Sequence, residues 1–251
     1  MNDPYLIPNS FVLKNKLNIT NQEKLDIAES AISKAKLHSI LDVKGDFDYK
    51  HLMDFHKHIL GDIYEWAGQP RVMNIEKAES VLAGLSVQYS HHKQIPVEAE
   101  AAINKLKNVN WSNLDTYEQK AEVFSKNMAT LWQVHPFREG NTRTVTEFCV
   151  QYAATQNVFL NQNLFAENAS FTRNALVMAS IGEYSDFSHL NRIVKDAMES
   201  GDKARVSVKE KTEQTKSTSK DIFSLKGVKD IDAKIKEQDY QAKEKKRDQS
   251  R

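Results

Sequence analysis

Two amphipathic helix patterns meet at the segment HPFREGNTR, residues 135–143. Apolar residues recur at helical spacing on both sides of this segment. The stripe before it consists of Ala121, Phe124, Met128, Leu131 and Trp132, and the stripe after it of Val145, Phe148, Cys149, Tyr152 and Ala153. Pro136 cannot continue a helix, and it favours extended backbone angles at His135. The segment is therefore expected to be a loop between two helices.

The helix ends on either side of this loop can also be placed. The first helix is expected to start at Asp115, which can cap its free N–H groups, with Glu118 three residues later as a capping-box acid. The second helix is expected to begin near residues 141–143, so its first N–H groups have no acceptor within the helix. Those groups point back into the loop, where Gly140 allows the backbone to approach a ligand closely.

The residue types in the loop suit phosphate chemistry. A phosphate on the free N–H groups meets the positive end of the helix dipole, and Arg143 adds a planar guanidinium that matches phosphate oxygens. Asn141 can donate a further hydrogen bond, and Glu139 offers the carboxylate that Mg²⁺ uses beside substrate phosphates. His135 titrates near working pH and can take a proton from a hydroxyl. These residues predict transfer of a phosphorus-containing group to a hydroxyl, with Phe137 as a core anchor of the loop.

The loop resembles the motif of the Fic family, His-Pro-Phe-x-Asp/Glu-Gly-Asn-Gly-Arg-x-x-Arg. It matches at residues 135–141 and again at Arg143. The segment IYEWAG at residues 63–68 and the segment LKNKL at residues 13–17 also resemble parts of that family. The resemblance covers about residues 5–200. It implies an all-α fold, a Fic-type helical bundle with a short β-hairpin flap over the active-site loop.

The resemblance implies a protein adenylyltransferase that moves AMP from Mg-ATP to a Tyr, Thr or Ser hydroxyl of a target protein and releases pyrophosphate. By position, His135 would be the general base and Glu139 would hold Mg²⁺. Gly140, Asn141 and Thr142 would surround phosphate oxygens, and Arg143 would contact the outer phosphates. The physical argument agrees, because phosphoryl transfer depends mainly on positioning and charge neutralisation.

Two positions depart from the family motif, and a family signal is missing. Thr142 replaces the second glycine, and Thr146 replaces the second arginine, which in the family contacts the γ-phosphate and pairs with an inhibitory glutamate. No Ser or Thr in the chain has Glu four residues later, so the family's autoinhibitory Ser/Thr-x-x-x-Glu motif is absent. We therefore expect either a separate antitoxin-like inhibitor or no such inhibition.

A change of pattern between Trp66 and His92 predicts the flap. Apolar residues there lack helical spacing, and a hairpin is expected across about residues 72–88. In the family this flap pairs with an extended target segment, which is strand addition. The residues expected to dock a target are Ile75, Glu76, Lys77, Ala78, Glu79 and Ser80. The alternative is an ordinary connecting loop.

Charge and composition divide the chain into a Fic domain, residues 1–200, and a charged tail or linker, residues 201–251. The tail carries 15 Lys and Arg against 10 Asp and Glu, whereas residues 1–200 carry 20 against 24. Few apolar residues occur in the tail, which predicts disorder or a solvated helix after Lys229. Interspersed acids argue against a nucleic-acid or membrane surface, and no apolar run is long enough to span a membrane.

The other sequence features favour packing over chemistry. No signal peptide pattern opens the chain, which favours folding in a reducing cytoplasm, with secretion into a host cell as a toxin or effector left open. A bacterial source is what the family resemblance implies. Cys149 is expected in the core. His51, His56 and His58 do not share a helical face with carboxylates at metal spacing, so they predict helix packing along the stripe of Leu52, Phe55, Ile59 and Ile63.

Two other functions stay open at this point. The transferred group can be UMP, GMP, phosphocholine or phosphate, although the match at residues 139–141 favours nucleotidyl transfer. A non-enzymatic function is the second alternative. The departures at Thr142 and Thr146 are compatible with a degenerate nucleotide sensor or a protein-binding module.

Overall fold

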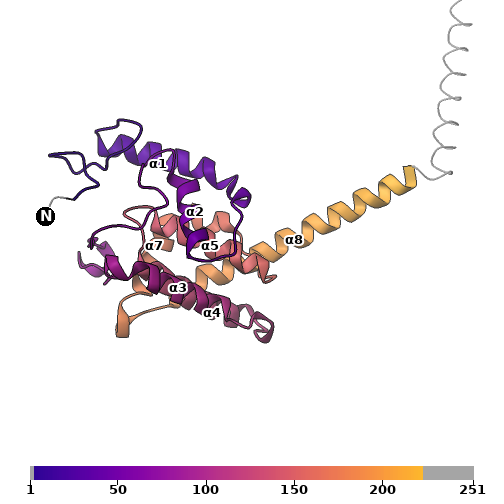
Figure 1. The fold of residues 1–251 in the computed structure, drawn as a ribbon. Coiled ribbons are helices and arrows are strands. Elements are labelled where there is room, and N and C mark those ends of the chain that lie inside the picture. The colour runs from indigo at the N-terminus through magenta and orange to yellow at the C-terminus, as the bar shows by residue number, and fades with distance from the viewer. Residues whose placement is uncertain (1–2, 223–251) are drawn as a thin grey trace, which may run out of the picture. The chain divides into compact units, whose positions relative to one another are not determined.

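The computed structural model describes residues 3–222, and the regular elements in this range are helices (Figure 1). In chain order they are α1 Gln22–Leu37, η1 Ile40–Asp42, α2 Tyr49–Leu60, η2 Ser80–Leu82, η3 His92–Gln94, α3 Ile95–Lys107, η4 Trp111–Asn113, α4 Tyr117–Val134, α5 Asn141–Thr155, α6 Gln162–Glu167, α7 Ala169–Met178, η5 Gly182–Tyr184 and α8 Ser188–Ile222. The prediction of a helical fold is confirmed.

Helices α2, α3, α4 and α5 form the packed centre of the domain. Helix α3 packs against α4, and α5 packs against both α2 and α4. The apolar stripes predicted on α2, α4 and α5 are buried, including Phe55, Phe124, Trp132 and Phe148. Cys149 lies in the same core, as expected. Because α4 and α5 are fixed by this packing, the loop between them is held at both ends.

The start of α4 lies one residue later than expected. Its N-cap is Thr116, not Asp115, and the capping-box partner is Gln119, not Glu118. The Thr116 hydroxyl accepts the Gln119 N–H at 3.2 Å, and the Gln119 side chain accepts the N–H groups of Thr116 and Asp115. The sequence contains two overlapping capping patterns, and a side-chain amide can complete the box as well as a carboxylate can. The apolar stripe alone does not distinguish these two registers.

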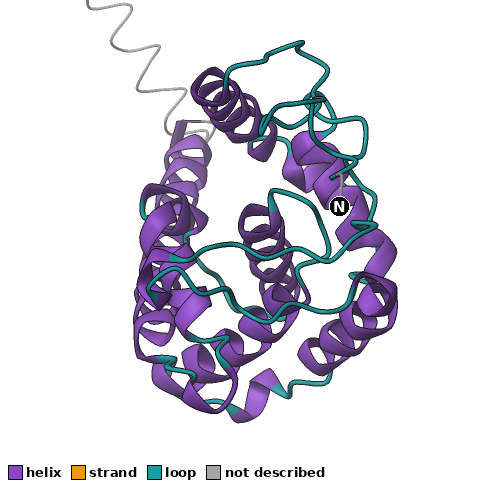
Figure 2. Cartoon of the chain, turned by 90° about the vertical axis from the view of Figure 1, so that its left-hand side faces the viewer, coloured by secondary structure: helices purple, strands orange, loops and turns teal. Residues whose placement is uncertain are grey.

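The hairpin expected across residues 72–88, here called the flap segment, is not confirmed. No strand occurs among residues 3–222, and Figure 2 shows helices connected by loops in this range. The flap segment contains only the short 3₁₀ helix η2. Side chains occupy backbone groups that a ladder would need: the Lys77 N–H binds the Ser86 hydroxyl at 3.0 Å. Paired strands therefore do not form here.

The ends of the flap segment are joined by the buried side chain of Arg71. Its guanidinium donates to the carbonyls of Met73 at 2.7 Å and Ser90 at 2.5 Å, and its Nε donates to the carbonyl of His135 at 2.8 Å. The Arg71 backbone N–H also donates to the Pro136 carbonyl at 2.8 Å. Arg71 is only 2 % exposed. One side chain thus ties Met73, at the start of the flap segment, and Ser90, two residues after its end, to the loop after α4.

The chain divides into two compact units at Gly201 and Asp202, and each is considered by itself. The first unit holds the loop and the flap segment. In the second unit the structure describes only the continuation of α8 to Ile222, so the helix expected after Lys229 lies outside the described residues. Among residues 3–222, no helix combines the length and apolar character needed to cross a membrane.

We expect Arg71→Met to lower the free energy of unfolding by at least about 3 kcal/mol, because several buried carbonyls lose their donors. Methionine keeps much of the apolar stem, so the loss isolates the guanidinium. Chemical denaturation monitored by circular dichroism measures the change. Arg192→Met, at an exposed position on α8, is the control. Equal unfolding midpoints for the two variants would contradict the interpretation.

Candidate active site

The loop begins with a left-handed residue. His135 caps α4 with φ 48° and ψ 59°, and its N–H donates to the Trp132 carbonyl at 3.0 Å. The expected extended conformation is therefore wrong. Pro136 disfavours a right-handed helical residue before it, but a left-handed C-cap also ends a helix and satisfies one of its last carbonyls. This conformation turns the chain sharply towards the start of α5.

The imidazole of His135 is fully buried between aromatic rings. The Tyr89 ring stacks on it with centroids 3.9 Å apart, and the Trp132 ring meets it edge-on at 5.2 Å. Neither ring nitrogen has a hydrogen-bond partner within the described residues. Burial, followed by the positive charges of Lys77 and Arg173, holds the pKa of His135 well below its usual value of 6.5. The imidazole is thus neutral near pH 7, which is the form that accepts a proton.

Phe137 and Asn141 fix the shape of the loop. Phe137 is fully buried, which confirms its predicted role as an anchor. The Asn141 carboxamide accepts the Phe137 N–H at 2.9 Å and donates to the Phe137 carbonyl at 2.8 Å. Asn141 is itself 2 % exposed. In this structure its side chain therefore holds the loop, and its backbone belongs to the first turn of α5.

Gly140 and Thr142 shape the N-terminus of α5. Gly140 has φ 79°, and a Cβ placed on it would lie 2.3 Å from a methyl carbon of Leu60, so only glycine fits. The first intrahelical bond runs from the Thr144 N–H to the Gly140 carbonyl, and no side chain caps this end. The N–H groups of residues 141–143 are consequently available to an anion. The Thr142 hydroxyl accepts the Trp132 indole N–H at 2.9 Å, which ties α5 to α4.

The carboxylate of Glu139 already has two partners. One oxygen accepts the Gly140 N–H at 3.1 Å, and the other lies 2.9 Å from the Lys77 ammonium. Burial alone would raise the pKa of Glu139, but the Lys77 charge and these hydrogen bonds lower it to about 2. The side chain is therefore ionised near neutral pH.

The residues around Glu139 offer a metal ion a single carboxylate. No group of three or more His, Cys, Asp or Glu side chains suited to a metal occurs in the described part of the chain. A single ionised carboxylate is, however, what Mg²⁺ needs when substrate phosphates supply further oxygens. Lys77 must leave Glu139 to make room for such an ion. The residues thus fit a metal that arrives with a nucleotide rather than a resident one.

Arg143 projects from α5 towards α1. Its guanidinium lies 3.4 Å from the Glu29 carboxylate, whose other oxygen accepts the Tyr64 hydroxyl at 2.5 Å. Burial raises the pKa of Glu29, while these two partners oppose that shift. Position 146 supplies no second cation, because threonine is uncharged; Thr146 is 8 % exposed and its hydroxyl is unpartnered in the residues described. Arg143 is therefore the one arginine that this segment shares with the two arginines of the family motif.

The expected target-docking residues divide into two groups. Glu79 and Lys77 turn inward: Lys77 reaches Glu139, and Glu79, 4 % exposed, pairs with Arg173 of α7 at 2.5 Å. Glu79 is therefore not exposed in this structure, and the role of the six residues in target docking stays a prediction. The other four do not pair in this way. Glu76, Ala78 and Ser80 are exposed, while Ile75 is partly buried beside a polar cavity of about 170 Å³ that also involves Asp3 and Arg138.

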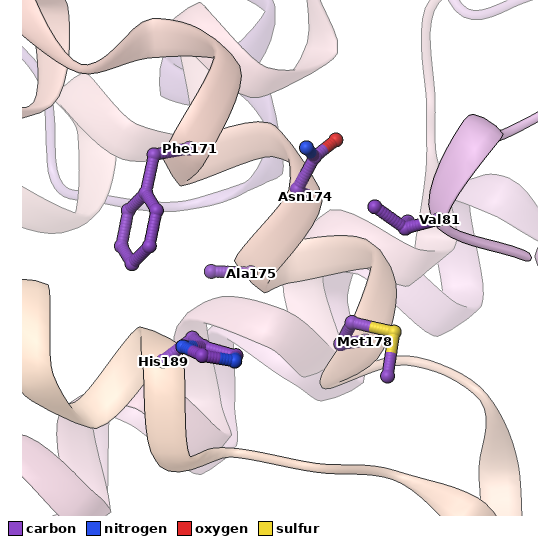
Figure 3. Close-up of a pocket in the computed structure, with 6 residues that line it drawn as sticks. All are labelled: Val81, Phe171, Asn174, Ala175, Met178 and His189. Atoms are coloured by element: carbon purple, nitrogen blue, oxygen red, sulfur yellow. The ribbon is translucent and has the colours of Figure 1, made fainter.

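A second cavity, of about 320 Å³, lies between the flap segment and α7 (Figure 3). Val81 of η2 forms one wall, and Phe171, Asn174 and Met178 of α7 form another. His189 at the start of α8 completes it, with its ring edge-on to Phe171 at 5.8 Å. The lining is mainly apolar, with the Asn174 carboxamide and the His189 ring as polar groups. This is the size range of small-molecule sites.

Sequence reasoning missed several residues that shape the site, and His56 is the clearest. Its Nδ1 accepts the Gly68 N–H at 2.8 Å, so its Nε2 carries the proton and donates to the Glu139 carbonyl at 3.0 Å. The ring also stacks on Phe137 with centroids 3.7 Å apart. A signal was present, because His56 lies four residues from both Leu52 and Leu60 on the apolar side of α2. Tyr89, Glu29 and Arg173 left no such signal.

Comparison with known proteins places this geometry in a family. The model of the Fic/DOC family matches residues 46–153. The probable protein adenylyltransferase y4lH of Sinorhizobium fredii is 33% identical over 150 residues, which cover 58% of this chain and 72% of that protein. This chain belongs to the Fic/DOC family. The names of such Fic/DOC relatives support AMP transfer to proteins at the level of the family.

One further relative and two solved structures are similar to this chain to different extents. Protein adenylyltransferase VbhT of Bartonella schoenbuchensis is 34% identical over 157 residues, covering 61% of this chain but only 31% of VbhT. The N-terminal Fic domain of a Bartonella quintana VirB-translocated effector, solved with ADP, has a TM-score of 0.64 at 20% identity, covering 77% of this chain and 93% of that one. BepC of Bartonella tribocorum, solved with AMPPNP, has a TM-score of 0.61 at 19% identity, covering 77% and 95%. These structures show a shared fold.

The stability of the Fic domain should fall as the pH drops below 6.5. Burial, the largest cause, lowers the pKa of His56 to about 4, and His135 is lowered as well. Between these values the unfolded chain binds protons that the folded chain does not, so acid favours unfolding by about 1.4 kcal/mol per pH unit for each histidine. Chemical denaturation at pH 7, 6 and 5 measures the slope.

The variant His56→Gln should show a weaker dependence of the unfolding free energy on pH. The contribution of one histidine is lost, because glutamine does not titrate. Val97→Ala, at an exposed position in α3, is the control and should keep the wild-type slope, because neither side chain titrates. An unfolding free energy that stays constant from pH 7 to pH 5 in the wild type would refute the assignment of buried neutral histidines.

Proposed function

We propose that this chain transfers AMP from Mg-ATP to a hydroxyl side chain of a target protein and releases pyrophosphate. The observation that carries the proposal is the buried neutral imidazole of His135, in the same loop as the ionised carboxylate of Glu139 and before the uncapped N-terminus of α5. Membership of the Fic/DOC family supports the same reaction. The chain spans less than a third of VbhT, so the activity, substrate and partners of the whole protein are part of the proposal.

The proposed step begins with the target hydroxyl. His135 takes its proton on a ring nitrogen while the hydroxyl oxygen forms a bond to the α-phosphorus. The bond between the α-phosphorus and the oxygen that bridges to the β-phosphate breaks, and pyrophosphate leaves with the electron pair. The N–H groups of residues 141–143 and the Arg143 guanidinium neutralise the phosphates. Glu139 would hold Mg²⁺, which supplies further neutralisation of charge on the phosphate oxygens.

The cavity between the flap segment and α7 is the proposed site for the nucleotide base. A purine is flat and largely apolar, which suits a lining of Val81, Phe171 and Met178. The Asn174 carboxamide offers both a donor and an acceptor to the base edge. Solved relatives with ADP or AMPPNP bound are consistent with an adenine nucleotide at a Fic domain.

Target docking at the flap segment requires a change from the structure described here. The Tyr89 ring covers His135, and Lys77 occupies Glu139. We propose that an extended target segment pairs with the exposed backbone around Glu76 and Ala78, so that the flap segment adopts its strand form by strand addition. The chain lacks the Ser/Thr-x-x-x-Glu motif, so the same proposal keeps both alternatives for regulation: a separate antitoxin-like protein, or no such inhibition.

The test is incubation of the protein with ATP labelled at the α-phosphate, Mg²⁺ and cell lysate. We expect a labelled protein band with the wild type and at least about a hundredfold less label with His135→Ala, because the general base is lost. His38→Ala is the control and should label normally. Equal labelling by His135→Ala would remove His135 from the role of base. Label from the γ-phosphate, or nucleotide binding without label, would contradict AMP transfer.

Glu139→Gln should also reduce the transfer rate, by about a hundredfold, because a carboxamide keeps the shape but does not neutralise Mg²⁺. Raising the Mg²⁺ concentration should restore only part of the rate. Glu183→Gln, an exposed change in η5, provides the control. The measurement is the initial rate of label transfer over a series of Mg²⁺ concentrations. A Mg²⁺ dependence that matches the wild type would rule out Glu139 as the metal ligand.

A further inference from the structure

The two walls of the base cavity are joined by one ion pair. Val81 lies on η2, two residues after Glu79, and Phe171, Asn174 and Met178 surround Arg173 on α7. The Arg173 guanidinium contacts both carboxylate oxygens of Glu79, with Nη2 at 2.5 Å and Nε at 3.3 Å. The pair therefore links the same two elements that line the cavity. Its length sets how closely η2 approaches α7.

The Glu79–Arg173 ion pair is buried, so breaking it carries a free-energy penalty. The Glu79 side chain is 5 % exposed and that of Arg173 is 32 % exposed. A buried carboxylate that loses its partner carries a large penalty, because neither water nor another cation compensates it. By contrast, the Lys36–Asp62 pair, with exposures of 33 % and 60 %, leaves its carboxylate in water. The flap segment is thus held against α7 by more than a surface contact.

The Glu79–Arg173 ion pair is also connected, through Tyr89, to His135, the proposed general base of the reaction. The Tyr89 hydroxyl donates to Oε1 of Glu79 at 3.4 Å, the same oxygen that Arg173 contacts, and the Tyr89 ring stacks on His135. Glu79 thus contacts Arg173, which lies among the α7 residues of the cavity, and Tyr89, whose ring lies on the His135 imidazole. A shift of η2 that widens the cavity would also draw Tyr89 away from His135.

We propose that Glu79 and Arg173 are positioning residues that set the width of the base cavity and couple its occupancy to the cover over His135. The inference rests on the proposed function, because it assigns the cavity to a nucleotide base. Neither side chain needs to touch the reacting atoms. The competing idea is that Arg173 binds phosphate directly and is merely masked by Glu79, since its charge is also felt at Glu139.

The two ideas predict opposite changes in nucleotide affinity for the variant Glu79→Gln. If the pair positions the cavity, loss of the Glu79 charge loosens η2 and weakens nucleotide binding. If Glu79 masks a phosphate ligand, the same change frees Arg173 and strengthens binding. Titration calorimetry with the non-hydrolysable α,β-methylene analogue of ATP and with inorganic tripolyphosphate, each with Mg²⁺, separates base from phosphate contributions without any chemical step.

We expect Glu79→Gln and Arg173→Met each to weaken binding of the ATP analogue about tenfold. The affinity for tripolyphosphate should change less than about twofold. The charge swap Glu79→Arg with Arg173→Glu should recover a large part of the loss, because it restores the ion pair between the start of η2 and α7. Lys36→Met is the matched control and should bind both ligands as the wild type does. If Arg173→Met does not fold, Arg173→Lys keeps the charge but loses the two-point contact and should give an intermediate loss.

Three results would overturn the inference: tighter binding by Glu79→Gln, equal weakening of both ligands, or no recovery in the charge swap. Failure of the proposed function has a different signature. Wild-type protein that binds the ATP analogue but never transfers AMP would remove the reaction and leave the cavity result standing. Wild-type protein that does not bind the analogue would overturn both.

Discussion

The candidate site depends on the burial of one guanidinium. Arg71 holds the carbonyls of Met73, at the start of the flap segment, and Ser90, two residues after its end, and the carbonyl of His135 in the loop. Three acceptors far apart in sequence are thereby brought to one planar group with fixed donor directions. Tyr89, whose ring stacks on His135, lies between the flap segment and the Ser90 carbonyl that Arg71 holds.

Around that junction, the charged side chains of the site are already paired with one another. Lys77 neutralises Glu139, Glu29 neutralises Arg143, and Glu79 neutralises Arg173. A nucleotide with its metal ion would therefore exchange partners rather than meet bare charges. Such exchange keeps the desolvated site from carrying unpaired ions, whose cost is large. It also means that binding strength reflects the difference between two sets of pairs, so removing one internal partner can strengthen or weaken binding.

Sequence reasoning found the parts that local patterns determine. The stripes on α2, α4 and α5 are buried as their spacing predicts, and α5 begins at Asn141 within the expected range. It failed where two local solutions were equally good, as at the Thr116 capping box, or where a helix end could be finished in two ways, as at His135. It could not find pairs such as Arg143 with Glu29, 114 residues apart, because no local period connects them. The roles of the loop residues in transfer stay predictions.

The flap segment lacks strands for a related reason: side chains already pair with its polar groups. A hairpin needs its backbone N–H and carbonyl groups to face each other, but here Arg71 and the Ser86 hydroxyl take some of them, and Glu79 is drawn inward to Arg173. An extended partner chain would bring a complete set of backbone donors and acceptors, which a loop held by side chains lacks. We therefore propose that the flap segment is an edge that a target completes, and that the ion pairs of Lys77 and Glu79 set how far it must move to do so.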